Sequence, residues 1–170
     1  MTLAARRGRS GLSGAAAAVI DAWALLGGLT LLAVVAMNIA SVIGGVVWAP
    51  FPGDFELTQI GVAVAAFAFL PYCELTGANV TADIFTSGAG RRLLAVLKLL
   101  ASIVAFLFSL LLFWRMYGGL LDQKEYNYIT AIVEFPIWVA FVPILISLAL
   151  LAAAAAITLG DNARGIAGRP

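Results

Sequence analysis

The side chains that could do chemistry in this chain are few, and the missing types limit its function. The 170 residues contain no histidine and one cysteine, Cys73. Without histidine the chain has no imidazole for a haem anchor, a zinc site or general-base catalysis. A single cysteine allows neither an internal disulfide nor a C-x-x-C redox pair. We therefore expect no catalytic residue, no metal site and no bound cofactor.

Polar groups in or beside the apolar blocks are the remaining candidates, because such groups are energetically expensive in lipid. Asp21 precedes the first block and is expected at the membrane interface; the alternative is a proton-coupled carboxylate, as in small multidrug exporters. Asn38 lies within that block, where an amide is expected to hydrogen-bond a neighbouring helix. Glu56 and Glu74 bracket the second block and are expected to be its two solvated ends. No charged pair is placed to form a substrate or ion site at mid-membrane depth.

Four long apolar blocks carry these residues and predict an all-α integral membrane protein. The chain is 63% hydrophobic and 11% charged. A bilayer core of about 30 Å requires about 20 apolar helical residues. We expect transmembrane helices at about 22–47, 57–73, 97–114 and 135–159, in one transmembrane domain that comprises residues 1–170.

The first block could also belong to a signal peptide, since arginines precede it and Ala22-Trp23-Ala24 resembles a cleavage site. In a secretory signal, however, the apolar run lies before the cleavage site. Here the main run follows Ala24 and continues to Val47 without a charge. We therefore expect a retained helix, tilted because its 26 residues reach about 39 Å.

The positions of lysine and arginine predict the orientation. Eight of the ten basic residues fall in the N-terminal tail, the central connection with the start of the third block, and the C-terminal tail. The other two connections hold only Arg115 and Lys124, together with five acidic residues. By the positive-inside rule, both termini are expected to be cytoplasmic.

Several local features carry further expectations. Gly61, Ala65 and Ala68 form a small-residue stripe that suits either a partner subunit or packing within the chain.

The segment from Gly118 to Tyr128 is expected to be a loop. Pro136 is expected in the first turn of the last helix, and Pro143 is expected to kink that helix. The formal net charge of +1 gives no reason to expect a nucleic-acid partner.

The connection after the second block has an unusual pattern, with a turn at Gly77 and then alternating polar and apolar residues up to Thr86. We expect a short interfacial helix on the cytoplasmic face, with Arg91 and Arg92 as anchors among lipid headgroups. The alternative is a docking element for a larger subunit.

This connection and the four-span plan resemble the small membrane subunit (DctQ type) of tripartite ATP-independent periplasmic (TRAP) transporters. The family motif after the second helix consists of a Gly, any one residue, His or Asn, Val, any two residues, Asp and two hydrophobic residues. In this chain the motif corresponds to Gly77-Ala78-Asn79-Val80-Thr81-Ala82-Asp83-Ile84-Phe85. Glu56 at the start of the second helix and Phe135-Pro136-Ile137-Trp138 at the start of the fourth also match. The resemblance covers about residues 56–151, whereas the first helix matches only in length and position. Many members have His where this chain has Asn79, and Val where it has Ala82.

The resemblance implies a non-catalytic subunit of a sodium-driven importer of organic acids in the bacterial inner membrane. Its partners would be a large multi-span permease subunit, which it would brace, and a periplasmic solute-binding protein, which its acidic periplasmic loops would help to dock. The residues expected to serve subunit contact or local structure are Gly77, Asn79, Asp83, Glu56, Pro136 and Trp138. The rival interpretation is a self-contained homo-oligomeric transporter or channel that uses Asp21 or Asn38.

Overall fold

The computed structural model describes residues 12–78 and 91–167, which form four long helices. These are α1 (Leu12–Val47), α2 (Asp54–Thr76), α4 (Arg91–Glu125) and α5 (Trp138–Ala167). Each is long and apolar enough to cross a membrane. The expected all-helical, four-span fold is confirmed: the protein is a multi-pass membrane protein.

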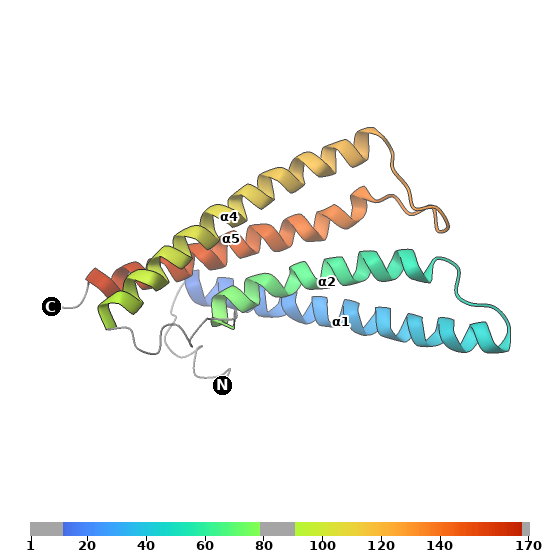
Figure 1. The fold of residues 1–170 in the computed structure, drawn as a ribbon, viewed down its shortest axis with the longest axis horizontal. Coiled ribbons are helices and arrows are strands. Elements are labelled where there is room, and N and C mark those ends of the chain that lie inside the picture. Colours follow the sequence, from blue (N-terminus) through green and yellow to red (C-terminus); the bar gives the residue numbers. More distant parts are fainter. Residues whose placement is uncertain (1–11, 79–90, 168–170) are drawn as a thin grey trace.

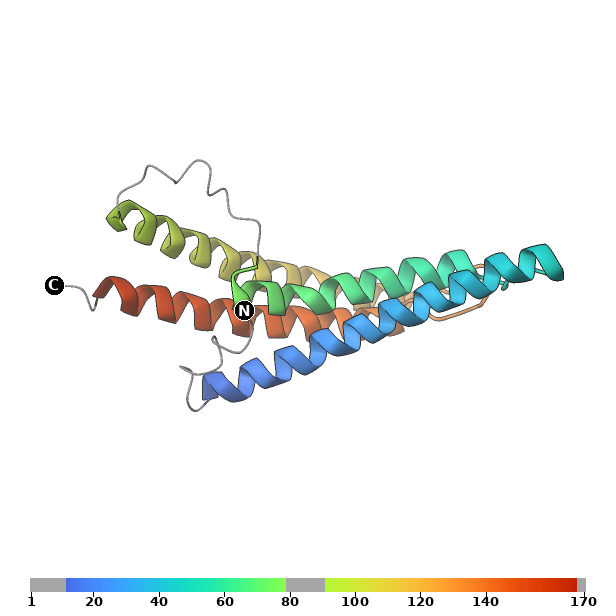
Figure 2. The same cartoon turned by 90° about the horizontal axis from the view of Figure 1, so that it is seen from below.

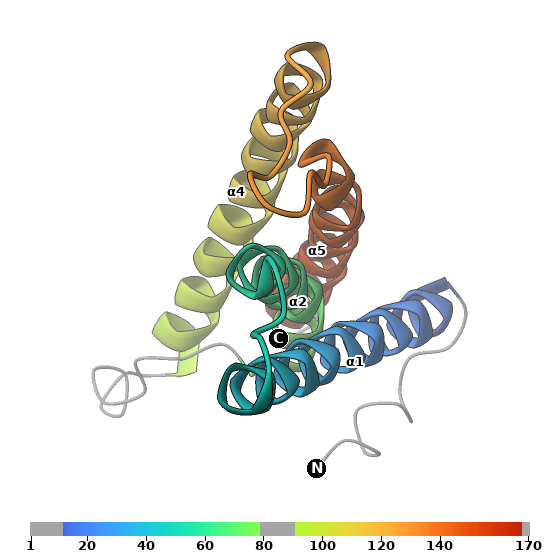
Figure 3. The same ribbon diagram turned by 90° about the vertical axis from the view of Figure 1, so that its right-hand side faces the viewer.

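The helices pack as an open series in the order α1, α2, α5, α4 (Figures 1 and 3). The two inner helices each contact two neighbours, whereas α4 packs mainly on α5 and α1 mainly on α2, with a smaller contact between α1 and α5. Figure 2 shows α1 running obliquely across the other helices. The start of α1 and the end of α5 lie at the same end of the bundle, and the α1–α2 and α4–α5 connections lie at the other.

Small residues form much of the buried core. Ala65, Ala68, Ala154 and Ala155 are almost completely inaccessible, so the backbones of neighbouring helices approach closely, as is common inside membranes. On α2, Gly61 faces Val34 of α1, and Gly27 of α1 faces Ala65 and Ala68. The small-residue stripe of α2 therefore serves packing within the chain, which decides between the two alternatives that the sequence left open.

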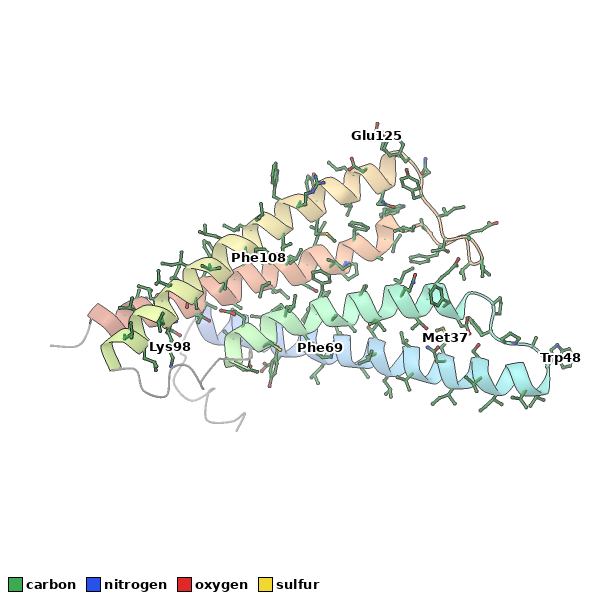
Figure 4. The ribbon with its side chains drawn as sticks, viewed as in Figure 1. Met37, Trp48, Phe69, Lys98, Phe108 and Glu125 are labelled. Atoms are coloured by element: carbon green, nitrogen blue, oxygen red, sulfur yellow. The ribbon has the colours of Figure 1, made fainter. Side chains whose placement is uncertain are left out.

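Large apolar side chains instead point outward along the edge helices (Figure 4). On α1 they include Leu25, Leu29, Leu32, Val42 and Ile43, and on α4 they include Leu100, Val104, Leu107 and Phe108. This arrangement places apolar surface where lipid or another membrane protein would cover it, because water cannot solvate it favourably.

All four helices are longer than the expected spans of 22–47, 57–73, 97–114 and 135–159, and two helix ends also change a local expectation. Helix α4 continues through Gly118 and Gly119 to Glu125, so the expected loop from Gly118 to Tyr128 is wrong over most of its length. Gly119 has a packing role there, since an added β-carbon would lie 3.1 Å from the ring of Phe141. Helix α5 begins at Trp138, so Pro136 precedes the helix and does not lie in its first turn. Helix α5 is continuous through Pro143.

Candidate functional site

The carboxylate of Glu56 joins the start of α2 to the connection between α4 and α5. The backbone N–H groups of three consecutive residues donate to it: Ala131 at 2.8 Å, Ile132 at 3.0 and 3.3 Å, and Val133 at 3.1 Å. Successive N–H groups that point at one centre form an anion-binding concavity. Glu56 is a partly exposed helix end, as the sequence suggested, and its carboxylate in addition anchors a loop that lies 75 to 77 residues further along the chain.

The α4–α5 connection presents these N–H groups because it folds back on itself. Ile129 and Pro136 form an antiparallel bridge, the N–H of Thr130 donates to the carbonyl of Phe135 at 3.0 Å, and the hydroxyl of Thr130 accepts from the N–H of Phe135 at 3.0 Å. The N–H of Ile137 donates to the carbonyl of Tyr128 at 3.1 Å. A hairpin-like loop results, with Ala131, Ile132 and Val133 at its tip.

Gly53 fits the start of α2 against this tip. It lies in the left-handed region with φ of 77°, which residues other than glycine adopt at a cost of about 1–2 kcal/mol. A β-carbon added to Gly53 would also collide with the Val133 side chain. The backbone of the α1–α2 connection can therefore approach the loop tip closely only because this residue lacks a side chain.

Asp54, at the first position of α2, binds the α1–α2 connection to α1. The Ser41 hydroxyl donates a hydrogen bond to one of its carboxylate oxygens, and the N–H of Phe55 donates to the other at 2.7 Å. Ser41 also accepts from the N–H of Phe51 at 3.1 Å. Two carboxylates at the start of α2 thus accept hydrogen bonds from the chain itself, Asp54 from Ser41 of α1 and Glu56 from the α4–α5 connection.

The residues predicted from the sequence to form a site divide between the two ends of the bundle. Pro136 lies in the bridge of the Glu56-bound loop, and Trp138 begins α5, with the ammonium of Lys124 5.7 Å from its ring centre.

Gly77 lies at the far end of α2, in the left-handed region with φ of 65°. Its N–H donates to the carbonyl of Glu74 at 3.3 Å, and the next N–H, of Ala78, donates to that of Cys73 at 2.9 Å, which ends the helix as expected at this glycine.

The other predicted residues lie outside the described part of the chain. Asn79 and Asp83 fall within residues 79–90, as does the expected interfacial helix. Arg91 and Arg92 begin α4, but their side chains are not described. Their roles remain predictions.

Polar side chains also join the helices within the membrane-spanning region. The Asn38 amide donates to Thr58 of α2 at 2.8 Å, as the sequence predicted for a helix contact. The Trp23 indole N–H donates to Ser147 of α5 at 2.8 Å, and the Asn162 amide donates to Ser102 of α4 at 2.6 Å. The sequence analysis did not single out either of these two pairs.

These contacts hold helices together and do not assemble reactive groups. Among residues 12–78 and 91–167, no three His, Cys, Asp or Glu side chains gather as metal ligands. The ionisable groups at the loop end of α2 accept hydrogen bonds from the chain itself. The arrangement therefore suits a structural role.

Comparison with known proteins assigns the chain to a family. A family model described as "Tripartite ATP-independent periplasmic transporters, DctQ component" matches residues 31–165. This match includes the last part of α1, which extends the resemblance beyond the range that the sequence motifs covered. No curated protein and no solved structure gives a significant match. The chain belongs to the DctQ family of small membrane components of TRAP transporters.

Proposed function

We propose that this protein is the non-catalytic small subunit of a sodium-driven importer of carboxylate solutes, located in the bacterial inner membrane. In this proposal it enlarges the rigid frame of a large permease subunit, and its acidic periplasmic connections help to dock the solute-binding protein. The observation that carries the proposal is the family match over residues 31–165. Sodium coupling and the carboxylate solute rest on the family resemblance.

The exposed apolar edges of the bundle support the bracing role. Helices α1 and α4 lie at opposite ends of the helix series and expose large aliphatic side chains along their lengths. One such edge can contact the permease while the other faces lipid. The polar contacts Asn38–Thr58, Trp23–Ser147 and Asn162–Ser102 hold the helices in register, as a frame that resists movement requires.

The proposal is tested by omission in reconstituted vesicles. The large subunit, the binding protein and this chain are combined under a sodium gradient, and uptake of radiolabelled carboxylates is measured with and without this chain. We expect uptake only with the complete set, and no flux through this chain by itself. Solute flux through the isolated chain would contradict the proposal and favour the self-contained transporter.

A second test concerns the family motif. Asp83→Ala is expected to lower uptake through lost assembly, without a change in solute preference. Recovery of the complex and the relative uptake of several carboxylates measure the two effects separately. Normal recovery together with altered selectivity would refute the assembly role of Asp83.

A further inference from the structure

The connection between α1 and α2 is an exposed and almost wholly apolar turn. The exposed fraction is 77% for Val47, 94% for Trp48 and 70% for Phe55. Between Val47 and Phe55 the one ionisable residue is Asp54. Its carboxylate accepts from Ser41 and from the N–H of Phe55, so it faces the protein. The turn therefore presents apolar and aromatic groups to its surroundings.

The backbone of this turn also offers few hydrogen-bond donors to water. Residues 48–55 include two prolines, which have no N–H. Four of the other six N–H groups donate within the chain, and the acceptors are the Gly44 carbonyl at 2.8 Å, Ser41 at 3.1 Å, the Phe51 carbonyl at 3.3 Å and Asp54 at 2.7 Å. Irregular backbone can approach lipid only when its polar groups are satisfied in this way.

The end of α1 extends beyond the start of α2. Asn38 contacts Thr58, and Ser41 contacts Asp54, so the first turn of α2 lies beside residues 38–41. Six further helical residues, 42–47, follow on α1, and at 1.5 Å each they extend about 9 Å. Figure 4 shows Trp48 at the tip of this extension. The exposed aliphatic surface of α1 continues without a break through Val42, Ile43, Val46 and Val47 to this residue.

The charged side chains at this end of the bundle lie mainly on the last turn of α4. Asp122, Lys124 and Glu125 are exposed there, and Glu134 is exposed in the α4–α5 connection. The apolar α1–α2 turn therefore differs in surface chemistry from the end of α4.

We propose that the α1–α2 turn lies in the headgroup–acyl boundary of the membrane and that lipid is its partner. Its surface continues the apolar, membrane-facing surface of α1, and it ends in a tryptophan, whose amphipathic ring favours this boundary. The inference requires that the chain spans a membrane, and it does not depend on the transport function proposed above.

Depth-dependent fluorescence quenching tests this assignment. In a Cys73→Ser background, Val47→Cys is labelled with the environment-sensitive dye NBD, and Asp122→Cys is the matched exposed position on the charged last turn of α4. The labelled full chain is reconstituted in phosphatidylcholine vesicles with or without brominated acyl chains. We expect blue-shifted emission at position 47, with several-fold stronger quenching by brominated lipid and several-fold weaker quenching by aqueous iodide than at position 122.

Water-like emission and equal iodide quenching at the two positions would overturn the inference. The measurement is repeated with the large permease subunit present. Loss of lipid quenching at position 47 in that complex would assign the turn to a protein partner and would also overturn it. Trp48→Cys gives a second labelling site if Val47→Cys does not fold, since both side chains are highly exposed.

Discussion

The carboxylate of Glu56 accepts hydrogen bonds from backbone N–H groups in an arrangement that commonly binds an anion. Three successive N–H groups at a loop tip form a binding site for a negative charge, and here the chain supplies that charge from the first turn of α2. Exposed charged side chains contribute little to global stability, but the hydrogen bonds of this carboxylate fix the conformation of a distant loop. Removing the carboxylate should therefore loosen that loop and leave the helices intact.

The first prediction concerns this carboxylate. Glu56→Gln retains the size of the side chain but replaces one acceptor oxygen with an NH₂ group, which cannot accept from the loop. We expect several-fold faster hydrogen exchange at the amides of Ala131, Ile132 and Val133, with the helices intact. Exchange followed by mass spectrometry measures this effect. Glu134→Gln, which removes an exposed carboxylate from the same connection, serves as the control and should leave these amides unchanged.

The second prediction compares two glycines of equal backbone conformation. Gly53 and Gly77 both have φ near 70°, at 77° and 65°, so alanine at either position should destabilise by about 1–2 kcal/mol. At Gly53 the new methyl group also collides with Val133, whereas at Gly77 no atom lies within 4 Å. Gly53→Ala should therefore lower the midpoint of thermal unfolding in detergent more than Gly77→Ala does. Equal losses would mean that the contact with Val133 is unimportant.

Between helices, close packing depends on individual glycines, because a side chain at the same position would collide with the neighbouring helix. An added β-carbon at Gly27 would lie 2.7 Å from the β-carbon of Ala68 and 3.5 Å from the carbonyl oxygen of Ala65, whereas at the adjacent Gly28 it would meet nothing within 4 Å. The two glycines are neighbours in sequence but face different surroundings, which makes them a matched pair.

The third prediction uses this pair. Gly27→Leu should force α1 away from α2 and destabilise the protein by about 1–3 kcal/mol, the usual range for overpacking. Gly28→Leu, with the same change in composition and helix propensity, should have little effect. Unfolding of the purified protein in mixed micelles, followed by circular dichroism, compares them. A similar loss for both variants would contradict the observed α1–α2 interface.

The helices could be predicted from the sequence because the physics of a membrane span depends on local composition. The charge-free runs located all four elements, and Gly77 marked the end of α2 because only glycine adopts a left-handed backbone readily. Helix ends in polar stretches were less predictable. Two glycines at 118–119 suggested a loop, but Phe141 packs over Gly119 and α4 continues.

The Glu56 contact could not be predicted, because its partners are backbone groups that carry no side-chain signature. Pro136 was placed in a helical first turn from a general preference, whereas its bridge with Ile129 belongs to the same loop. Such contacts depend on how two distant segments meet, and periodicity within either segment does not encode this. By contrast, the Asn38 contact was predictable, since a lone amide in an apolar run requires a partner.

At the scale of the whole molecule, the open series α1, α2, α5, α4 leaves two edge helices with broad apolar surfaces. The open arrangement spreads the protein over a wider area than a closed four-helix bundle would, which suits a subunit that covers part of a larger one.

The fourth prediction tests the helix order. In a Cys73→Ser background, paired cysteines at Asn38 and Thr58, or at Ser102 and Asn162, should form disulfides upon mild oxidation in membranes, because these side chains are in contact. Cysteines at Ile39 and Leu107 should not, since both side chains are exposed on the two edge helices. Gel mobility before and after reduction distinguishes the products. Efficient linkage of the last pair would contradict the open series.

The composition of the complex in its own membrane tests the proposed bracing of a permease. The full chain carries an affinity tag at its native level of expression, and the purified material is analysed by quantitative mass spectrometry. If the chain braces a larger permease, that multi-span subunit should be recovered in near-equimolar amount. Recovery of this chain by itself, or only with further copies of itself, would contradict a bracing role.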